Sequence, residues 1–301
     1  MDAAALSTRY CTITEHAFTR VRDNQGRRFA PQMRISPDKF AADTLDPAKS
    51  EDQAETLAPY VDLAGKSVLE IGSGCGITHI VWTKKFGIDG WGVEPEGEGF
   101  DGSGAVAREL VAANGLYPAR IIDARGESLP FADARFDIVY SSNVLEHTDD
   151  PARVLNEALR VLKPGGTLQI VCPNYLSYFD GHYAALHPPI PSNAFFQWWV
   201  KWIYGADPAF ASTIRTEINP RWVRRQLAEL MRRYRMTVLT LGQEKFVERM
   251  DAAEVGRWMG LGLVGRLVSW SKAMRLNRLA ASLIVALNGW TPLIITLRRG
   301  A

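Results

Sequence analysis

One segment constrains the fold more than any other: Val68–Gly76 (VLEIGSGCG), a run rich in apolar residues that ends in closely spaced glycines. Such a run is typical of a buried parallel strand that is followed by a turn and a helix. Parallel sheets bind ligands at the carboxyl ends of their strands, where glycine lets the backbone approach the ligand closely. The segment therefore predicts an α/β fold with a ligand site at this turn.

Strands and helices alternate on both sides of the glycine turn. We expect helices over residues 47–64, 76–86, 104–114, 151–162 and 221–235, and strands over 67–72, 90–94, 120–123, 136–142, 167–172, 236–241 and 292–297. Repeated β-α units imply a parallel sheet with helices on both faces. The predicted fold is a doubly wound, mostly parallel seven-stranded sheet with helical and aromatic cap insertions.

The chain divides into three regions by pattern and charge. Residues 1–50 are an N-terminal extension, 51–175 the ligand-binding core, and 176–301 hold acceptor-binding insertions, a basic helical cap and the final strands. Residues 1–200 carry 18 Lys and Arg against 26 Asp and Glu, whereas residues 201–301 carry 17 against 7. A basic final third suggests an anionic partner, and a solvated helix surface is the alternative.

The cysteines and the N-terminus bear on compartment and metal content. Cys11, Cys75 and Cys172 are far apart and form no C-x-x-C pair, which argues against a disulfide framework and a zinc site. No carboxylate and histidine cluster has ligand spacing, so no metal is expected. The N-terminus lacks a secretory pattern. We expect a cytoplasmic protein, with attachment to the inner face of a membrane as the alternative.

Two acids indicate the kind of ligand at the glycine turn. Glu70 suits a ligand that carries an ammonium and a sulfonium, and it suits a pyrophosphate poorly. Glu94 ends the second expected strand, where a carboxylate can accept both ribose hydroxyls of an adenosine; an exposed loop acid is the alternative. The glycine spacing is G-x-G-x-G, and Ile77 stands where a dinucleotide fingerprint needs a small residue. A nicotinamide cofactor is therefore disfavoured.

At these residues the chain resembles a known family. Glu70–Gly76, Leu129–Phe131 (LPF), Asn143–His147 (NVLEH) and Val161–Gly166 (VLKPGG), with Glu94, together resemble the Rossmann-like (class I) S-adenosylmethionine-dependent methyltransferases. The likeness is greatest to the subgroup with an LPF turn and an LEH motif, and it covers about residues 60–175. It implies S-adenosyl-L-methionine as the cofactor.

The resemblance also implies which residues bind the cofactor. Those around its methionine and ribose parts would be Glu70, Gly72, Ser73, Gly74 and Gly76. Glu94 would hold the ribose, and Asn143 and Val144 would lie beside the methionine moiety and the sulfonium. Where many relatives carry an aspartate that contacts adenine, this chain has Arg125. The adenine contact is therefore expected from the backbone near Gly126 or from Glu127.

Candidate catalytic and acceptor-binding residues follow the cofactor motifs. A general base helps if the acceptor is a hydroxyl. His147 follows the fourth expected strand and either acts as that base or orients its turn. His182 lies in a polar, aromatic loop suited to substrate recognition, with a surface histidine as the alternative. Tyr175, Asp180 and His187 share the acceptor-binding hypothesis.

Two segments of the final third raise the question of membrane contact. Leu279–Leu297 lacks charge over a length that could span a bilayer, but Asn288–Pro292 breaks the run, so we expect a helix, a turn and a strand. Residues 252–290 mix apolar residues with cations, which is typical of interfacial helices and equally of a cap packed on its own domain. Peripheral membrane association through 252–290 is thus one hypothesis.

Together these patterns predict an enzyme that transfers a methyl group from S-adenosylmethionine to a small or lipid-linked acceptor. A sugar or isoprenoid-type hydroxyl is the expected acceptor. The alternatives are an NAD(P)-dependent oxidoreductase and a non-catalytic, cofactor-binding module that docks to a membrane or a partner. Nucleic acid is not an expected partner, because the basic third contains no recognisable binding motif. The sequence does not indicate an oligomeric state.

Overall fold

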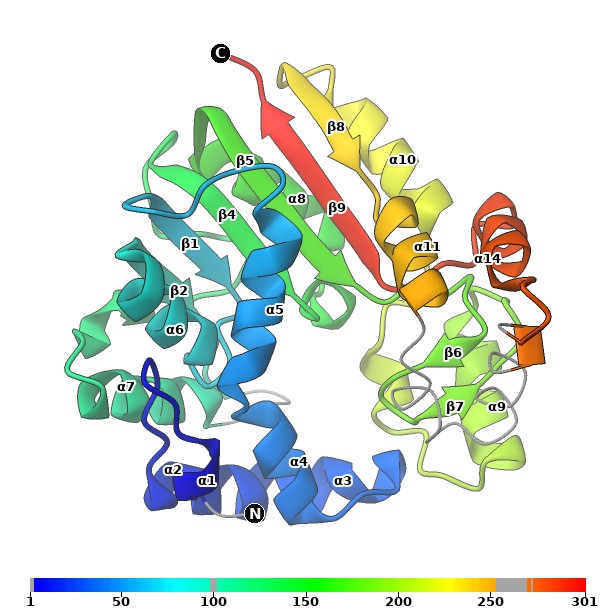
Figure 1. Ribbon diagram of the computed structural model, residues 1–301, viewed down its shortest axis with the longest axis horizontal. Helices are drawn as coiled ribbons and strands as arrows, with labels where there is room; N and C mark the ends of the chain where they lie inside the picture. Colours follow the sequence, from blue (N-terminus) through cyan, green and yellow to red (C-terminus); the bar gives the residue numbers. More distant parts are fainter. Residues whose placement is uncertain (1–2, 98–101, 253–269, 272) are drawn as a thin grey trace. The chain divides into compact units, whose positions relative to one another are not determined.

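The computed structural model describes residues 3–97, 102–252, 270–271 and 273–301 (Figure 1). The chain forms two compact units. Unit 1 comprises residues 1–170, 230–239 and 296–301, and unit 2 comprises residues 171–229 and 240–295. Three strands, β5, β8 and β9, cross from one unit into the other along their length.

A seven-stranded sheet has the strand order β3-β2-β1-β4-β5-β9-β8 (Figure 1). Its strands are β1 (Ser67–Ile71), β2 (Asp89–Val93), β3 (Ile121–Ile122), β4 (Phe136–Ser142), β5 (Leu162–Cys172), β8 (Met236–Thr240) and β9 (Leu293–Arg299). β1 pairs in parallel with β2 and β4, and β2 pairs in parallel with β3. β9 runs opposite to β5 and β8 (Figure 1). The predicted doubly wound, mostly parallel sheet is confirmed.

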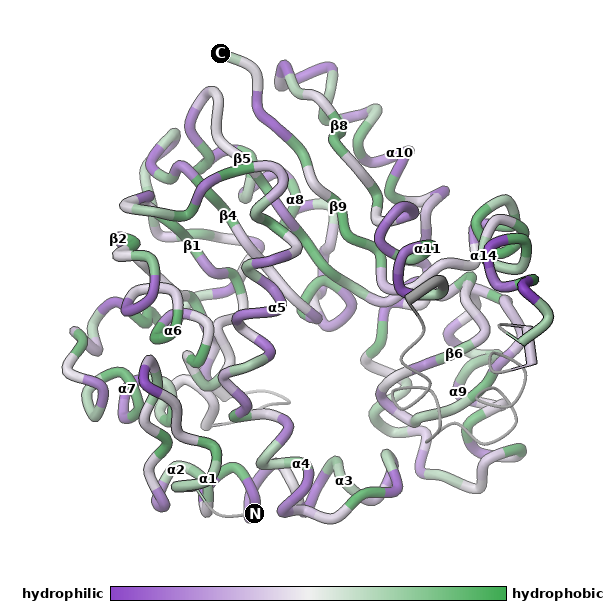
Figure 2. The backbone as a smooth tube through the Cα atoms, viewed as in Figure 1, coloured by the Kyte–Doolittle hydropathy of each residue, from purple (hydrophilic) through white to green (hydrophobic). Residues whose placement is uncertain are grey.

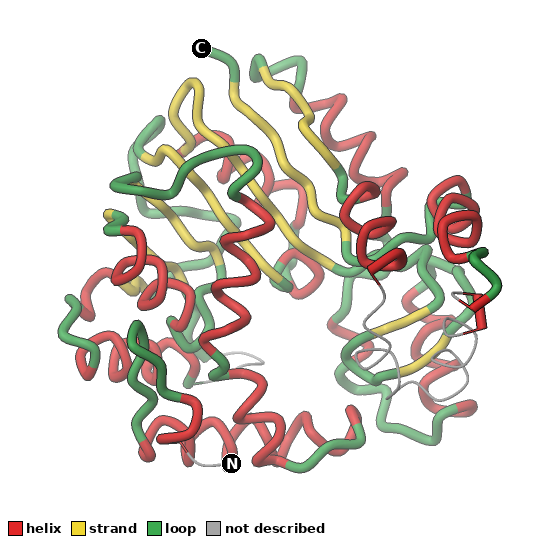
Figure 3. Tube along the Cα trace, in the orientation of Figure 1, coloured by secondary structure: helices red, strands yellow, loops and turns green. Residues whose placement is uncertain are grey.

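Helices cover both faces of the sheet in unit 1. α5 (Pro47–Leu57) and α6 (Ile77–Phe86) lie in front of the strands and α8 (Pro151–Val161) lies behind them (Figures 1 and 3). Asp150 caps α8 by accepting the amide proton of Arg153 at 3.0 Å, as its sequence predicts. Most residues of the central strands are buried, and Figure 2 shows hydrophobic stretches along β5 and β9. Each fully buried Leu or Ile contributes about 1.5–3 kcal/mol.

The N-terminal region, which the sequence left unassigned, is helical. It forms α1 (Ala3–Leu6), α2 (Glu15–Arg20), the π-helical turn η1 (Val21–Gly26), α3 (Arg27–Met33) and α4 (Pro37–Thr44). The Thr14 hydroxyl donates to Glu109 at 2.9 Å, and the Gln25 amide donates to Ser103 at 2.8 Å. Both partners lie on α7 (Ser103–Ala113), so the extension is fastened to the helix that follows β2.

Unit 2 is mainly helical and has an aromatic interior. Its elements include the hairpin β6 (Phe179–Asp180) and β7 (Ala185–Leu186), with α9 (Asn193–Ile203), α10 (Pro220–Leu230), α11 (Gln243–Ala252) and α14 (Asn277–Ala286). Tyr175 and Tyr183 pack edge-on against Phe196, with ring centroids 6.1 and 6.0 Å apart. The uncharged run is the end of α14, a turn and β9, as expected. Residues 253–269 and 272 of the expected amphipathic segment lie outside the described residues.

Among the described helices, none combines the length and the apolar character needed to cross a membrane.

Candidate functional site

The glycine turn after β1 is held in one conformation by its neighbours. Gly72, Gly74 and Gly76 all have positive φ, at 71°, 51° and 77°. A Cβ atom on Gly72 would lie 2.2 Å from a methyl carbon of Val144, so no larger residue fits there without displacement. The amides of Gly72 and Ser73 donate to the Val93 carbonyl at 2.8 and 3.0 Å. The turn is therefore fixed to the end of β2.

Two buried carboxyl groups face this turn. Glu94 follows β2, and its Oε2 accepts the amide proton of Gly74 at 2.8 Å. Burial raises the pKa of Glu94 to about 7. Glu70 is the penultimate residue of β1, beside the turn, and burial, helped by the charge of Glu94, raises its pKa to about 8. Burial favours the neutral form of both carboxyl groups, because water no longer solvates their charge. A cationic ligand bound beside them would favour the charged form instead.

Two polar atoms at the turn have no partner of their own. Glu70 Oε2 and Ser73 Oγ are buried and make no hydrogen bond to any described residue. Unsatisfied buried polar atoms cost about 1–3 kcal/mol each, so they are uncommon in native proteins unless a ligand or water completes them. The acids, the unpaired oxygens and the glycine backbone fit a ligand with a cationic end and a ribose. The predicted residues Glu70, Ser73 and Glu94 are brought together here.

Other residues near the turn were not predicted. Hydrogen bonds from the Thr78 hydroxyl and the His79 amide partly offset the rise in the pKa of Glu70. The Thr78 hydroxyl also lies 3.1 Å from Gln53 Oε1 of α5, so Glu70 and Gln53 compete for its single proton. From the N-terminal extension, the charge of Arg20 acts on the buried thiol of Cys75, whose pKa burial raises to about 12. No sequence motif marks Gln53, Thr78, His79 or Arg20, because their proximity to the turn arises only from packing.

The segment after β4 meets the glycine turn through Val144. Asn143 has a positive φ of 54° and an exposed side chain, whose amide donates to Ser142 Oγ at 3.4 Å. His147 lies on the 3-10 turn η3 (Leu145–His147), where its amide donates to the Val144 carbonyl at 2.8 Å. Its Nε2 lies 3.9 Å from the buried carboxylate of Glu146. The imidazole thus lies close to a buried carboxylate of the same 3-10 turn.

The residues expected near adenine have packing roles of their own. A Cβ on Gly126 would lie 3.0 Å from Ile71 and 3.3 Å from Val154, so close packing also favours glycine at this position. The Glu127 carboxylate accepts the amide protons of Asp149 and Asp150 at 2.8 and 3.4 Å. Glu127 therefore fixes the loop that precedes α8, and an adenine contact from it stays a prediction.

In unit 2, a buried acid orients a histidine. Asp180 is 1% exposed, and its Oδ2 lies 3.1 Å from His182 Nδ1. Its Oδ1 accepts the Tyr183 amide proton at 2.9 Å. A carboxylate on one ring nitrogen fixes the tautomer and the direction of the other, which is what a general base requires. The predicted pair Asp180 and His182 is thus brought together.

His187 and Tyr175 belong to the interior of unit 2. Their rings lie 5.4 and 6.1 Å from that of Phe196. His187 Nδ1 lies 2.8 Å from the Pro188 carbonyl, and burial lowers the pKa of this histidine. Its Nε2 is buried and makes no hydrogen bond to any described residue. Both side chains are therefore inside the unit, and contact of either one with an acceptor stays a prediction.

Comparisons with known proteins bear on this site. Residues 69–170 match the family model described as a methyltransferase domain. An uncharacterized methyltransferase of Mycobacterium sp. (strain KMS) is 34% identical over 160 residues, which cover 49% of this chain and 59% of that protein. One from Mycobacterium leprae (strain Br4923) is 37% identical over 138 residues, 43% of this chain and 48% of that protein. The chain thus spans less than two thirds of the length of these relatives.

Solved structures share the fold at low identity. A putative sarcosine dimethylglycine methyltransferase from Galdieria sulphuraria has a TM-score of 0.52 and 16% identity, covering 90% of each chain. The [4+2]-cyclase SpnF has a TM-score of 0.51 and 18% identity, covering 95% of this chain and 94% of its own. Because a cyclase shares it, this fold by itself does not establish a reaction. The resemblance to S-adenosylmethionine-dependent methyltransferases is confirmed for residues 69–170, and S-adenosylmethionine is the cofactor of that family.

Proposed function

We propose that this chain, whose residues 69–170 form a methyltransferase domain, transfers a methyl group from S-adenosylmethionine to a hydroxyl of a small or lipid-linked acceptor. The observation that carries the proposal is the pair of buried acids, Glu70 and Glu94, with raised pKa values at the glycine turn. Neither acid makes an ion pair with a described residue, and a ligand that brings its own positive charge supplies what they lack.

In this proposal, different residues of unit 1 bind different parts of the cofactor. Glu94 holds the ribose hydroxyls, and Glu70 favours the cationic end of the ligand. Gly72 and Val144 shape the space beside the glycine turn. S-adenosylmethionine supplies an already activated methyl group, so the protein contributes alignment and the exclusion of water.

Calorimetric titration with S-adenosylmethionine and S-adenosylhomocysteine tests the cofactor assignment. Glu94→Gln should weaken binding about 10–100-fold, because a charge-assisted hydrogen bond contributes about 1.5–3 kcal/mol. Glu96→Gln is the matched control, since Glu96 pairs with Arg108 at the surface. If neither compound binds the native chain, or if both variants bind as well as it does, the proposal is wrong.

The preference for a hydroxyl acceptor rests on Asp180 and His182. An imidazole whose Nδ1 is fixed by a buried carboxylate can accept a proton from an attacking hydroxyl. A general base typically contributes 10²–10⁴-fold to a rate. We expect His182→Ala to lower turnover about 100-fold while leaving the affinity for S-adenosylmethionine unchanged. His16→Ala, at an exposed histidine paired with Glu109, is the control. Full activity of His182→Ala would remove this role.

The lipid-linked class of acceptor is supported by exposed apolar side chains on unit 2. On α14 and its flanks, Leu279, Leu283 and Leu287 are 69%, 60% and 57% exposed. On α9, Trp198 and Trp202 are 49% and 66% exposed. Leucines three or four residues apart share one helix face, and exposed apolar faces that include tryptophan are typical of contact with a lipid interface. Arg275 and Arg278, both exposed, add positive charge near the start of α14.

Co-sedimentation with vesicles tests this docking. The double variant Leu279→Ser, Leu283→Ser should lose most binding to vesicles of phosphatidylglycerol, because about 2–3 kcal/mol of apolar transfer is removed for each leucine. Tyr117→Ser is the control, since Tyr117 is exposed but lies in unit 1. Equal binding by both variants would favour a small acceptor that is free in solution.

A further inference from the structure

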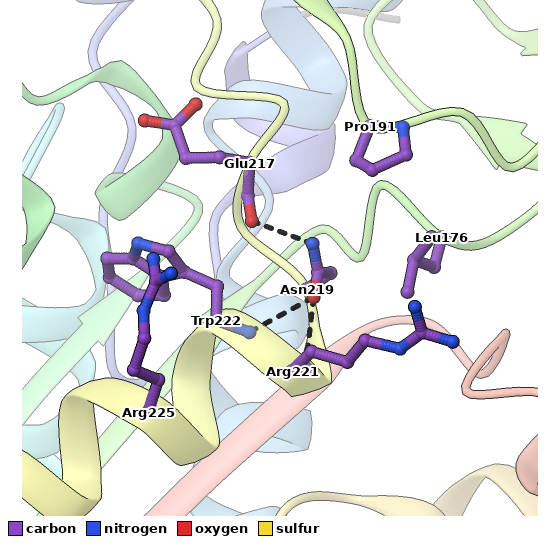
Figure 4. Close-up of a pocket in the computed structure, with 7 residues that line it drawn as sticks. All are labelled: Leu176, Pro191, Glu217, Asn219, Arg221, Trp222 and Arg225. Carbon is purple, nitrogen blue, oxygen red and sulfur yellow. Dashed lines mark hydrogen bonds between the residues drawn. The ribbon is translucent and has the colours of Figure 1, made fainter.

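A pocket of about 430 Å³ lies at the start of α10 in unit 2 (Figure 4). Its size falls in the range of small-molecule sites. The lining residues combine an apolar wall with three charged side chains: Leu176, Pro191, Glu217, Asn219, Arg221, Trp222 and Arg225. All of them belong to unit 2, and none has a role in the cofactor site.

Two arginines give the pocket its charge. Arg221 and Arg225 are exposed and stand four residues apart on α10, so they share one face of the helix. Among the residues that the structure describes, neither guanidinium has a hydrogen-bond or ion-pair partner. The neighbouring Arg224 differs, because it donates to Asn288 at 2.9 Å and lies 6.0 Å from the centre of the Trp290 ring. Arg221 and Arg225 are therefore available to a ligand, whereas Arg224 is part of the fold.

The helix N-terminus itself is not available. Asn219 Oδ1 accepts the amide protons of Arg221 and Trp222 at 2.9 and 3.1 Å, and its Nδ2 donates to the Glu217 carbonyl at 2.8 Å (Figure 4). The first amides of α10 are thus already paired. Any anion in this pocket must be bound by the arginine side chains.

We propose that this pocket binds the phosphate or diphosphate group of an organic phosphoester. The planar guanidinium fork matches the geometry of phosphate oxygens. In Figure 4 the Arg221 guanidinium lies on the side of Leu176 and the Arg225 guanidinium on the side of Trp222, so the two exposed side chains must turn from these positions to bind one doubly charged anion together. Leu176, Pro191 and the indole of Trp222 offer apolar surface to the organic part of the ligand. Glu217 is the single acid in the lining, and in Figure 4 its carboxylate is turned away from the Arg221 guanidinium and lies on the same side as the Arg225 guanidinium.

The pocket deepens the proposed function if its phosphoester is the methyl acceptor, and this step rests on that proposed function. An acceptor with a phosphate handle would be held by unit 2 independently of the cofactor. Binding of the anion needs no S-adenosylmethionine, so failure of the pocket and failure of the methyl-transfer proposal are measured separately.

Titration calorimetry with inorganic pyrophosphate tests the site on the full chain. Arg221→Gln and Arg225→Gln should each weaken binding about tenfold or more, which corresponds to about 1.4 kcal/mol. Arg235→Gln is the charge-matched control, because Arg235 is exposed, lies outside the pocket and belongs to unit 1. Glu217→Gln should tighten binding several-fold, since it removes the negative charge from the lining. Thermal unfolding of each variant checks that the fold is retained.

A second titration identifies the source of the phosphate. Vesicles of phosphatidylcholine with and without phosphatidic acid present a phosphate monoester at a lipid surface. Binding that requires phosphatidic acid and both arginines supports the site with a lipid-held ligand, and binding of pyrophosphate alone supports it with a free phosphoester. Absence of saturable binding to both probes overturns the proposal, as does an equal loss of affinity in Arg235→Gln.

Discussion

Buried carboxyl groups occur in both units, and they differ in how many of their oxygens are hydrogen-bonded. In unit 2, Asp180 has a partner for each oxygen, His182 on one side and the Tyr183 amide on the other. In unit 1, Glu70 keeps a buried oxygen with no hydrogen bond to a described residue, and burial raises its pKa to about 8. A buried acid whose oxygens are both hydrogen-bonded holds its neighbours in position. A buried acid with an unpaired oxygen indicates a site where a ligand would supply the missing positive charge.

The largest expected effect tests whether the glycine turn is what encloses Glu70 and its unpaired oxygen. Gly72→Ala should lower the free energy of unfolding by about 2–5 kcal/mol. The new Cβ atom would overlap with Val144, and the positive φ at this position is strained for any residue other than glycine. Gly74→Ala shares the positive φ but has no atom within 4 Å of its Cβ, so it should lose only about 1 kcal/mol. Urea unfolding measures both, and equal losses would contradict the close contact with Val144.

Removing the paired acid should be costly. Asp180→Ala leaves the Tyr183 amide without its acceptor and His182 without its carboxylate, so we expect a loss of about 2–3 kcal/mol in unfolding free energy. Asp180→Asn keeps one acceptor oxygen and should lose less. If Asp180 acts through His182, Asp180→Asn also moves the acid limb of the rate profile to lower pH. A variant with native stability and an unchanged profile would show that the pairing is unimportant.

Removing the unpaired acid should have the opposite sign. The pKa of Glu70 rises from an ordinary 4.5 to about 8 on folding, so its contribution to stability is greatest below 4.5 and is lost as pH rises through 8. Glu70→Gln should therefore be about 1–2 kcal/mol more stable than the native chain at pH 9, and this advantage should vanish near pH 4.5. Unfolding across this pH range is the measurement. A destabilised variant at pH 9 would mean that Glu70 already has a cationic partner.

The same comparison predicts how the cofactor responds to pH. A ligand that favours ionised Glu70 and Glu94 should bind more tightly as pH rises from 6 to 9, by at most about tenfold per pH unit for each group that loses a proton. Calorimetry in buffers of different ionisation enthalpy should detect released protons. If the affinity does not change with pH, the ligand does not interact with Glu70 and Glu94.

The smallest effect concerns the exposed face of unit 2. Leu283→Ser changes a side chain that is 60% exposed, so the free energy of unfolding should shift by less than about 0.5 kcal/mol. Chemical denaturation measures it, and Leu69→Ser, at a fully buried position, should by contrast lose several kcal/mol. A large loss at Leu283 would show that this leucine is packed in solution and not presented to a partner.

Local patterns predicted the sheet and the turn correctly, because strand, glycine and helix signals are adjacent in the chain. The expected strand over residues 136–142 coincides with β4, and the helix expected to begin at Pro151 does begin there. The N-terminal helices were missed, since their apolar faces are short and the first 35 residues show no sustained period. The expected helix over 221–235 ends earlier, at Leu230, where the chain leads into β8.

The sequence by itself determined the order of β-α units, the glycine turn and the identity of the two acids, because each depends on a few neighbouring residues. Only the tertiary structure decided that Glu70 Oε2 lacks a hydrogen-bond partner among the described residues and that Asp180 has two partners. It also decided that Gln25 reaches α7 and that the charge of Arg20 acts on Cys75 in the turn after β1. Pairing and desolvation depend on atoms distant in the chain. For that reason the sequence identified each charged side chain, whereas its burial, its partners and the direction of its pKa shift came only from the tertiary structure.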